Sequence, residues 1–442
     1  MKTPRLIDYS DSILRSDAVL SDTLLQFRNC TLLRDHRLVT EDLWVENGRI
    51  LNPEPIFYLE KRAADLQIDC GGALISPGFI DVQLNGAFGI DFSTDQGAQF
   101  HVRLDQVCRK LLQYGVTSFC PTLISSPSEV YTKVLPQLQT YRNQKCSAQL
   151  LGVHLEGPFI NDAKKGVHSS SNLVAGFSSS ESALKEMQAV YGQDFMQHAA
   201  VVSLAPELPN ALPLIRKLTD TYGIKVSLAH SLASVVEGEE AVRSGATAIT
   251  HLFNAMLPFH HRDPGLVGLL ASKHIPQDRT LFYGVISDGI HTHDAALRIA
   301  YRTHPQGLML VTDACAALGL ADGAQVVMGD FAVEVHGSRA LRAGTTDMLA
   351  GSVSSMDTCV RHLLKAARCS VIEALECATL HPAQFLQLSH RKGTLDFATD
   401  ADFVLLHPQE LKVEASFVAG QLAWERMTDE GRGGCGLHAQ GY

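Results

Sequence analysis

The chain has 442 residues, a formal net charge of −10 and a hydrophobic content of 45%. A chain of this length is expected to form one large domain and a smaller one. The negative charge argues against binding of nucleic acid or of an anionic membrane surface, although one or two local cations could still bind a small anion.

The cysteines and the first residues indicate a cellular compartment. The ten cysteines lie far apart and form no CxxC pair, which is typical of reduced thiols in a cytosolic protein. The first 25 residues are polar and contain no apolar core of a signal peptide, and no apolar run reaches the ~18 residues of a membrane span. We therefore expect a cytoplasmic protein without a membrane segment.

The two ends of the chain share one pattern. Residues 23–75 alternate short apolar runs with turns, and Asn47-Gly48 predicts a tight β-hairpin. Residues 392–420 repeat this pattern. We predict a small β-sandwich domain made from residues 1–76 and 393–427, in which residues 1–22 form a flexible leader, and a flexible Gly-rich tail over residues 428–442.

Residues 77–392 alternate strand-like and helix-like segments. Helices are expected at Phe100–Tyr114, Ala211–Tyr222 and Ala295–Thr303. Two further helices, at Met356–Arg368 and Val371–Thr379, are expected to close the series. Eight strands alternating with helices predict a closed parallel (β/α)8 barrel of the TIM type, an α/β fold. The predicted strands are Gly78–Leu84, Thr117–Leu123, Leu151–Glu156, Ala199–Leu204, Lys225–His230, Ala248–Leu252, Leu281–Ser287 and Leu308–Asp313.

Polar residues end four of these strands, at the barrel end where catalytic residues project. Glu156, His230 and His251 offer one carboxylate and two imidazoles, which suits a catalytic divalent ion such as Zn²⁺ with a position left open. Taken singly, each histidine could be a hydrogen-bonded core residue and Glu156 a salt-bridge partner. Their occurrence at three strand ends favours the metal site.

Asp313 ends the last predicted strand. A carboxylate beside a water molecule that a metal activates can take the proton of that water and then donate it to a leaving group. The alternative is a helix N-cap, where Asp is also favoured. The position of Asp313 beside the other three strand ends favours catalysis.

Longer motifs carry a family resemblance that covers roughly residues 20–425. The segment Pro77–Asp81, the strand-end ligands and Thr312–Ala314 resemble the amidohydrolase superfamily. Four further motifs resemble one family within it, the N-acetylglucosamine-6-phosphate deacetylases. These motifs are HLEGPF at 154–159, KGVH at 165–168, HLFNAM at 251–256 and DGIH at 288–291.

One departure from the wider superfamily bears on the number of metal ions. Many amidohydrolases carry His-x-His at the end of the first strand, where this chain has Gln83 and Asn85, and neutral amides are poor ligands for a transition metal. The chain resembles the deacetylase family in this feature. We expect one divalent ion per chain, Zn²⁺, and no metal at His291-x-His293, which follows the seventh strand.

The resemblance implies a reaction and its substrate contacts. The substrate would be N-acetyl-D-glucosamine 6-phosphate, hydrolysed at its acetamide to D-glucosamine 6-phosphate and acetate in amino-sugar catabolism, and the protein would be a homodimer. His168 would lie near the reacting amide, and Arg262, with its planar guanidinium, would bind the phosphate. The other implied contacts with substrate are Val167, Asn254, Ala255, Asp288, Gly289, Ile290 and His291.

An apolar turn follows the eighth strand at residues 348–352. It could form a wall for the acetyl methyl group, with backbone contacts from Asp347, Met348 and Leu349. Ordinary loop packing is the alternative for this turn, as a solvated loop charge is for Arg262.

Two other classes of function are alternatives to a deacetylase. One is an amidohydrolase that acts on a cyclic amide or on a different N-acetyl sugar, against which the residues expected at the phosphate argue. The other is an inactive scaffold, which should have lost a metal ligand or the catalytic acid. This chain keeps Glu156, His230, His251 and Asp313.

Overall fold

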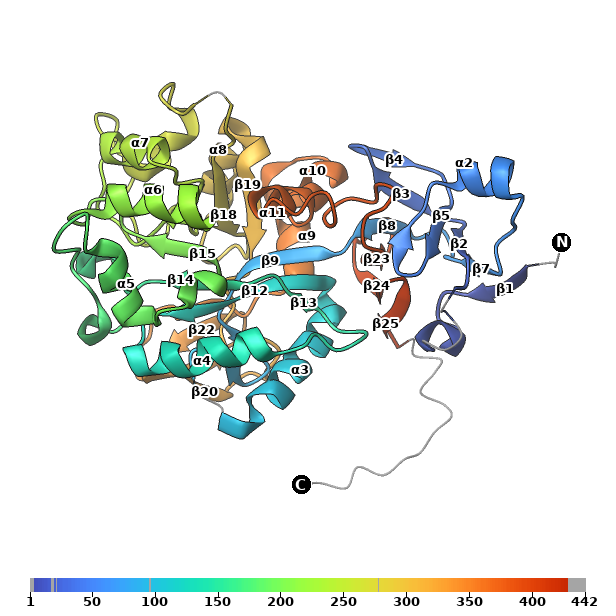
Figure 1. The fold of residues 1–442 in the computed structure, drawn as a ribbon, viewed down its shortest axis with the longest axis horizontal. Coiled ribbons are helices and arrows are strands. Elements are labelled where there is room, and N and C mark those ends of the chain that lie inside the picture. Colours follow the sequence, from blue (N-terminus) through green and yellow to red (C-terminus); the bar gives the residue numbers. More distant parts are fainter. Residues whose placement is uncertain (1–3, 17–19, 21, 95–96, 277, 428–442) are drawn as a thin grey trace.

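The computed structural model describes residues 4–427, apart from 17–19, 21, 95–96 and 277. Its larger part is a barrel surrounded by helices, and a smaller pair of β-sheets lies beside it (Figure 1). The tail predicted at residues 428–442 lies outside the described residues.

The barrel has eight parallel strands, as the sequence predicted. Each strand pairs with the next in chain order. The ring closes where the backbone N–H of Asp313 donates to the carbonyl of Gln83 (2.9 Å) and Leu84 pairs with Ala314. The strands are β9 (Phe79–Leu84), β12 (Val116–Ile124), β14 (Val153–Glu156), β15 (Ala199–Leu204), β16 (Lys225–Leu228), β17 (Ala248–Ile249), β18 (Phe282–Ile286) and β19 (Leu308–Val311).

Helices cover the outside of the barrel because each presents an apolar stripe to the strands. Helix α6 (Ala211–Tyr222) is an example: it buries Leu214, Ile215 and Leu218, which recur at helical spacing, and it ends at Gly223, whose φ of 68° suits a residue without a side chain. The other helices of the barrel are α3 (Phe100–Leu111), α4 (Ser128–Thr140), α5 (Ala183–Tyr191), α7 (Val235–Arg243), α8 (Asp294–Thr303), α9 (Met356–Ala367), α10 (Val371–Glu376) and α11 (Leu380–Phe385).

A small antiparallel sheet follows the eighth barrel strand, and the sequence analysis did not predict it. Its strands are β20 (Gln325–Met328), β21 (Phe331–His336) and β22 (Arg339–Arg342). Alternate residues of β21 are buried and pack in one cluster with Ile124, the last residue of β12, and Cys315. The sheet therefore lies against the ends of the barrel strands from which the candidate site projects.

Both ends of the chain build the smaller part of the molecule. Its core joins Phe27 from the N-terminal part to Phe403 and Phe417 from the C-terminal part, with ring centroids 5.0 and 5.3 Å from that of Phe27. One sheet has the order β1 (Arg5–Asp8), β7 (Leu66–Asp69), β2 (Leu25–Arg28), β5 (Leu43–Glu46) and β6 (Arg49–Ile50). The other has the order β25 (Gln421–Glu425), β24 (Val413–Val418), β23 (Phe403–Leu406), β8 (Leu74–Pro77), β3 (Thr31–Arg34) and β4 (Arg37–Val39).

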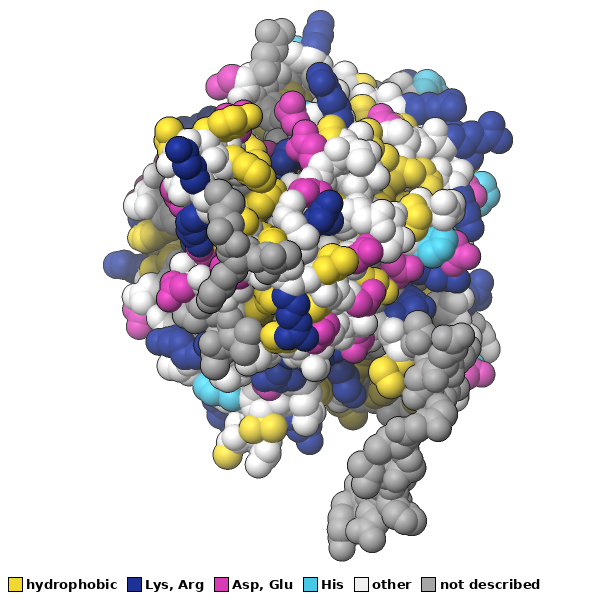
Figure 2. Space-filling model, turned by 90° about the vertical axis from the view of Figure 1, so that its right-hand side faces the viewer, with side chains coloured by type: hydrophobic (Ala, Val, Ile, Leu, Met, Phe, Trp, Pro, Cys, Tyr) yellow, Lys and Arg dark blue, Asp and Glu magenta, His cyan; other side chains and the backbone are white. Residues whose placement is uncertain are grey.

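The predicted hairpin at Asn47-Gly48 is confirmed. These two residues join β5 to β6, and their φ angles of 50° and 73° are those of a turn that matches the twist of the paired strands. On the face of this part of the molecule that Figure 2 shows, acidic and basic side chains are interspersed with apolar ones.

The prediction of a flexible leader over residues 1–22 is wrong for its described part. Residues Arg5–Asp8 form β1, which pairs in parallel with β7, and Ile7 and Leu14 are buried in the core between the sheets. Two aspartates of this polar segment accept local hydrogen bonds, Asp8 from the backbone N–H of Ser10 and Asp11 from that of Ile13. The buried side chains of Ile7 and Leu14, on either side of these aspartates, attach the segment to the edge of the sheet.

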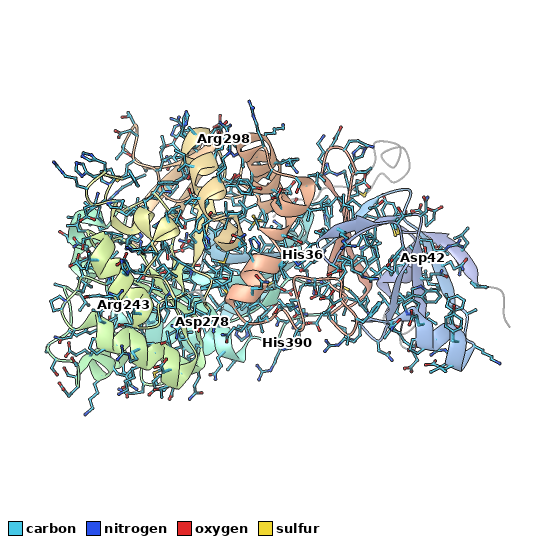
Figure 3. The ribbon with its side chains drawn as sticks, turned by 90° about the horizontal axis from the view of Figure 1, so that it is seen from above. His36, Asp42, Arg243, Asp278, Arg298 and His390 are labelled. Atoms are coloured by element: carbon cyan, nitrogen blue, oxygen red, sulfur yellow. The ribbon has the colours of Figure 1, made fainter. Side chains whose placement is uncertain are left out.

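The two parts of the molecule also contact each other through polar side chains. His36, in the turn between β3 and β4, lies 2.8 Å (Nδ1 to Oε1) from Glu376 of α10, and Figure 3 shows His36 at this junction, with Asp42 farther out on the smaller part. Among the described residues, no helix has the length and apolar composition needed to span a membrane.

Candidate active site

Four polar residues lie at the C-terminal ends of the barrel strands. Glu156 is the last residue of β14, whereas His230, His251 and Asp313 each lie two residues beyond the end of a strand. The latter three have φ angles of 47°, 30° and 47°, in a left-handed region that residues other than Gly rarely adopt. Backbone strain of this kind is concentrated at functional sites.

The carboxylate of Glu156 and the rings of His230 and His251 converge on one point. Glu156 Oε1 lies 3.4 Å from His230 Nε2 and 3.1 Å from His251 Nε2, and the two Nε2 atoms are 3.1 Å apart. All three side chains are buried. Two ring nitrogens and a carboxylate oxygen that meet in this way, with no Lys or Arg ion pair to Glu156 among the described residues, suit a divalent cation such as Zn²⁺.

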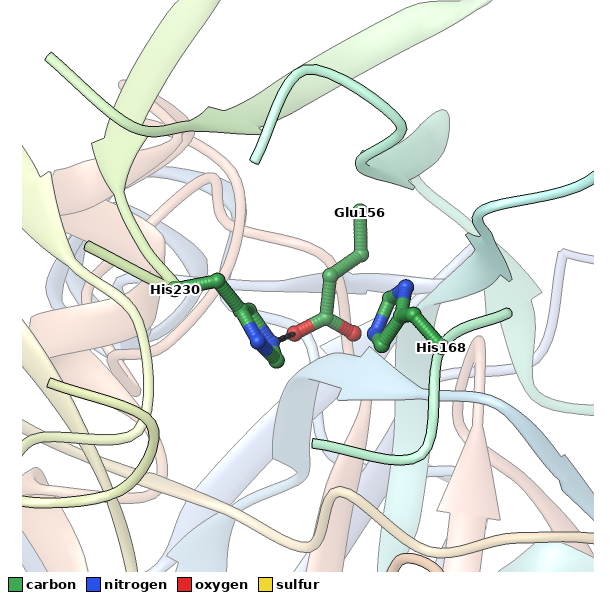
Figure 4. Close-up of side chains that lie close together, drawn as sticks. All are labelled: Glu156, His168 and His230. Atoms are coloured by element: carbon green, nitrogen blue, oxygen red, sulfur yellow. Dashed lines mark ion pairs between the residues drawn. The ribbon is translucent and has the colours of Figure 1, made fainter. Parts of the chain in front are cut away.

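His168 lies beside this cluster and is a further possible ligand by distance alone. Ligand atoms of Glu156, His168 and His230 all lie within 4.8 Å of one another, and Figure 4 shows the carboxylate of Glu156 between the two rings. The hydrogen bonds of the two rings show which of His230 and His168 presents a lone pair to a metal ion.

His230 Nδ1 lies 2.8 Å from the carbonyl oxygen of Lys164. A carbonyl can only accept, so Nδ1 carries the proton of the neutral ring and Nε2 presents its lone pair to the cluster. The tautomer of His230 is therefore the one that a metal requires.

His168 has the opposite tautomer. Its Nδ1 accepts from the backbone N–H of Ser125 (3.3 Å), and Ser125 Oγ is 2.7 Å away. Burial lowers the pKa of His168 to about 3, so the ring is neutral and its proton is on Nε2. His168 Nε2 is thus a hydrogen-bond donor and suits a substrate oxygen better than a metal. The sequence analysis missed Ser125, since nothing in the local pattern links it to His168.

His154, from the same strand as Glu156, is a structural histidine. Its ring nitrogens lie 2.9 Å from the carbonyl oxygen of Val82 and 2.7 Å from Ser203 Oγ, and burial lowers its pKa. Since both nitrogens have partners, His154 has no lone pair to offer a ligand.

The carboxylate of Asp313 is held by two amides. Asn85 Nδ2 donates to Asp313 Oδ1 (2.7 Å), and Gln83 Nε2 donates to the same oxygen (3.2 Å) and to Glu156 Oε1 (2.9 Å). Burial, and then the charge of Glu156, raises the pKa of Asp313 to about 6. Asp313 Oδ2 is not engaged by either amide. The sequence analysis treated Gln83 and Asn85 only as poor metal ligands and missed these contacts.

These groups surround a cavity of about 200 Å³. Apolar side chains that the sequence analysis did not single out form part of its wall, namely those of Ile124, Ile286 and Met328, the last of which comes from the inserted sheet. The predicted site residues that line the cavity are Glu156, Val167, His168, His230, His251, Asn254, Ala255, His291, Asp313 and Leu349.

Other predicted contacts lie outside the lining. Asp288 acts on the site indirectly, because its carboxylate accepts from the backbone N–H of His291 (2.8 Å) and lies 2.7 Å from the His291 ring. Arg262 is an exposed loop residue, and Met348 is 42% exposed. The predicted residues that do not line the cavity are Arg262, Asp288, Gly289, Ile290, Asp347 and Met348.

A strand-end carboxylate, two imidazoles, a second carboxylate and a buried cavity in a (β/α)8 barrel define a hydrolase barrel that can bind a metal. The model of the Amidohydrolase family matches residues 74–424, and the chain belongs to this family.

Within this family, the chain is similar in sequence to named enzymes. It is 55% identical to the N-acetylglucosamine-6-phosphate deacetylase of Bos taurus, over 91% of this chain and 96% of that protein, and 51% identical to the enzyme of the same name from Danio rerio, over 93% and 100%. The resemblance expected from the motifs is confirmed.

Solved structures agree with these relatives. The crystal structure of N-acetylglucosamine-6-phosphate deacetylase from Pasteurella multocida has a TM-score of 0.78 and 27% identity, and covers 90% of this chain and 99% of that chain. A mutant of the enzyme from Mycobacterium smegmatis, solved in complex with N-acetyl-D-glucosamine-6-phosphate, has a TM-score of 0.74 and 26% identity, and covers 91% and 99%.

Proposed function

We propose that this chain hydrolyses the acetamide of N-acetyl-D-glucosamine 6-phosphate, giving D-glucosamine 6-phosphate and acetate, in amino-sugar catabolism. The observation that carries this function is the convergence of Glu156, His230 and His251 beside the carboxylate of Asp313. The identity of more than 50% to named deacetylases over more than 90% of the chain supports the choice of substrate.

Each residue of the site has a place in this reaction. Glu156, His230 and His251 would hold one divalent ion, which when bound polarises the amide carbonyl and lowers the pKa of a water molecule. Asp313 takes the proton of the attacking water and later delivers it to the amine nitrogen as the C–N bond breaks. The Nε2–H of His168 donates to the oxygen on which negative charge develops.

The remaining cavity residues would bind the sugar phosphate. Asn254, Ala255 and His291 line the cavity, Asp288 orients the ring of His291, and Arg262 supplies a cation from outside the lining. Val167 and Leu349, which line the cavity, would contact the acetyl group. Gly289, Ile290, Asp347 and Met348 lie outside the lining and would contact the substrate at its edge.

Acetate release by the purified, metal-loaded protein tests this function. We expect turnover of N-acetylglucosamine 6-phosphate to exceed that of N-acetylglucosamine and of a cyclic amide. N-acetylgalactosamine 6-phosphate belongs in the same panel, because the chain is also 31% identical to an N-acetylgalactosamine-6-phosphate deacetylase from Escherichia coli O157:H7. A protein that binds metal and releases no acetate from either sugar phosphate would refute the proposal.

The number of metal ions is expected to be one per chain. Gln83 and Asn85 donate hydrogen bonds through their amide nitrogens to Asp313 and Glu156, so those nitrogens cannot serve as ligands of a second ion. Elemental analysis after dialysis against buffer measures the stoichiometry, and we expect about one Zn²⁺. Two tightly held ions per chain would contradict the mononuclear site.

The kcat should fall on the acid side of pH ~6. The pKa of Asp313, raised to about 6 by burial and by Glu156, is lowered when a cation binds nearby, and Asp313 must be ionised to accept a proton. Activity is thus fully present above the pKa and is lost as the pH falls through it. The profile of kcat at saturating substrate, with metal content checked at each pH, should give an acid midpoint at or below about 6, and a midpoint above 7 would exclude Asp313 as the base.

Arg262→Ala should damage turnover of the phosphorylated sugar far more than that of N-acetylglucosamine. A charge-assisted hydrogen bond to phosphate contributes about 1.5–3 kcal/mol, which corresponds to roughly 10- to 100-fold in kcat/KM. Arg243→Ala, at an exposed position on α7, is the matched control. Equal loss on both sugars, in a folded and metallated variant, would reassign the phosphate to Asn254 and His291.

Assembly, location and domain limits are further parts of the proposal. We infer a homodimer in the cytoplasm, supported by the family resemblance and by the free thiols of the described cysteines. We divide the chain into a small β domain of residues 1–76 and 393–427 and a barrel of residues 77–392. Light scattering of the purified protein tests the homodimer, and limited proteolysis tests the domain limits.

A further inference from the structure

Glu207 is a carboxylate outside the cavity that accepts three hydrogen bonds from two separate segments. It lies in the connection between β15 and α6. Its Oε1 accepts from Asn161 Nδ2 (3.0 Å) and from the backbone N–H of Leu232 (2.7 Å), and its Oε2 accepts from Ser231 Oγ (2.7 Å). Among the described residues no Lys or Arg forms an ion pair with Glu207. Its carboxylate is therefore held by these three hydrogen-bond donors.

One of the two segments begins directly after the metal-site residue His230. Ser231 and Leu232 follow it in the chain, and Ser231 Oγ also accepts from the backbone N–H of Ala233 (2.9 Å). Glu207 therefore fixes the backbone immediately beyond His230, at a position where His230 itself has a strained φ of 47°.

The other segment, residues 161–168, will be called the pocket loop. It begins at Asn161, whose side chain donates to Glu207 and also accepts from the backbone N–H of Ala163 (3.0 Å), which caps a short helical turn at Asp162–Lys164. It ends with Gly166, Val167 and His168, which line the cavity.

The pocket loop meets His230 at two points. The backbone N–H of Asn161 donates to the carbonyl of His230 (2.9 Å), and the carbonyl of Lys164 accepts from His230 Nδ1 (2.8 Å). The second contact sets the tautomer that leaves Nε2 free. The turn that presents the Lys164 carbonyl is capped by Asn161, and Asn161 is in turn held by Glu207.

We infer that Glu207 is a positioning residue that keeps the pocket loop and His230 in one arrangement, and so controls both the retention of the metal and the placing of His168. The inference rests on the proposed function, because it assigns His230 to the metal and His168 to the substrate. Removal of a group that orients a metal-binding histidine typically lowers the metal affinity or the activity 10- to 100-fold. A carboxylate that holds two elements at once links metal binding to substrate binding.

The test compares Glu207→Ala with two variants of the full-length protein. Glu207→Gln is the conservative replacement: its carbonyl can still accept from Asn161 and Leu232, and Ser231 Oγ can accept from its amide. Glu237→Ala is the matched control, because Glu237 also accepts several hydrogen bonds, from the backbone and hydroxyl of Ser234, but caps the neighbouring helix α7.

The first readout is the rate at which each zinc-loaded protein releases Zn²⁺ to a chromophoric chelator. We expect release from Glu207→Ala to be about tenfold faster than from wild type, with Glu207→Gln close to wild type and Glu237→Ala unchanged. The second readout is cleavage by trypsin after Lys164 or Lys165 in metal-free protein, which should be faster only in Glu207→Ala. In turnover assays Glu207→Ala should raise KM as well as lower kcat.

Equal zinc release from Glu207→Ala and Glu237→Ala, or a loop that trypsin cuts no faster, would overturn the inference. If Glu207→Ala does not fold, Asn161→Ala removes the same connection from the loop side and must then show the faster release and cleavage. A wild-type protein without deacetylase activity, in which Glu207→Ala still releases zinc faster and is cut faster, would refute the proposed function and leave the positioning role standing. Normal deacetylase activity, together with equal zinc release from Glu207→Ala and Glu237→Ala, would support the proposed function and refute the positioning role of Glu207.

Discussion

Asp313→Asn is expected to keep the fold and the metal and to lose about 10²–10⁴ in kcat, the usual contribution of a general acid–base group. The replacement fits the site because an asparagine carbonyl at this position can still accept from Asn85 and Gln83, both of which donate to Asp313 Oδ1. What the amide cannot do is take a proton at the position of Oδ2. In the proposed reaction Asp313 serves both half-steps, so the loss should lie at the upper end of this range.

Three measurements on the same preparation decide this prediction. Initial rates of acetate release give kcat, elemental analysis gives the metal content, and thermal unfolding shows whether the fold is intact. Metal content and unfolding temperature should match those of wild type. Turnover within threefold of wild type would remove Asp313 from the mechanism.

His251→Ala and His230→Ala should each lose most of the bound metal and, with it, nearly all activity. Each substitution removes one of three donors whose atoms lie 3.1–3.4 Å apart, and the buried carboxylate of Glu156 then loses a partner that lowers its pKa despite the opposing effect of burial. Elemental analysis after dialysis measures the loss. His261→Ala, in an exposed loop, is the control and should keep its metal. A His251→Ala protein that retains a full equivalent of zinc would show that the ion is bound elsewhere.

Much of the barrel could be predicted because parallel strands buried on both faces have nearly continuous apolar sequences. Helix α6 was predicted at the residues where it is found, Ala211–Tyr222. The strand ends were predicted only approximately, since the strands before His230, His251 and Asp313 end two or three residues earlier than expected. The pattern still indicated Glu156, His230, His251 and Asp313 as neighbours in space.

What the sequence did not reveal depends on contacts between distant residues. The opposite tautomers of His168 and His230 are set by Ser125 and Lys164, which are 43 and 66 positions away in the chain. Likewise, Gln83 and Asn85 look only like missing ligands until Asp313, more than 220 positions later, is placed beside them. No local periodicity encodes such pairs.

The inserted sheet β20–β22 and the strand β1 were missed for a different reason. Their strands are short, and only β21 shows a regular alternation of buried and less buried residues. Their stability comes from the surfaces on which they pack, such as the cluster around Phe331 and Ile124, more than from their own sequence.

The packing of Phe27 against Phe403 and Phe417 has a consequence for the order in which the protein is made. The ribosome delivers the N-terminal strands first, then the whole barrel, and only near the end the strands that complete the sandwich core. Until Phe403–Leu406 and Val413–Val418 emerge, β8 lacks its antiparallel neighbour and the apolar face around Phe27 lacks its cover. The first part to be synthesised is therefore the last to be completed, and chains that terminate within the barrel would expose a half-built sandwich to chaperones and proteases.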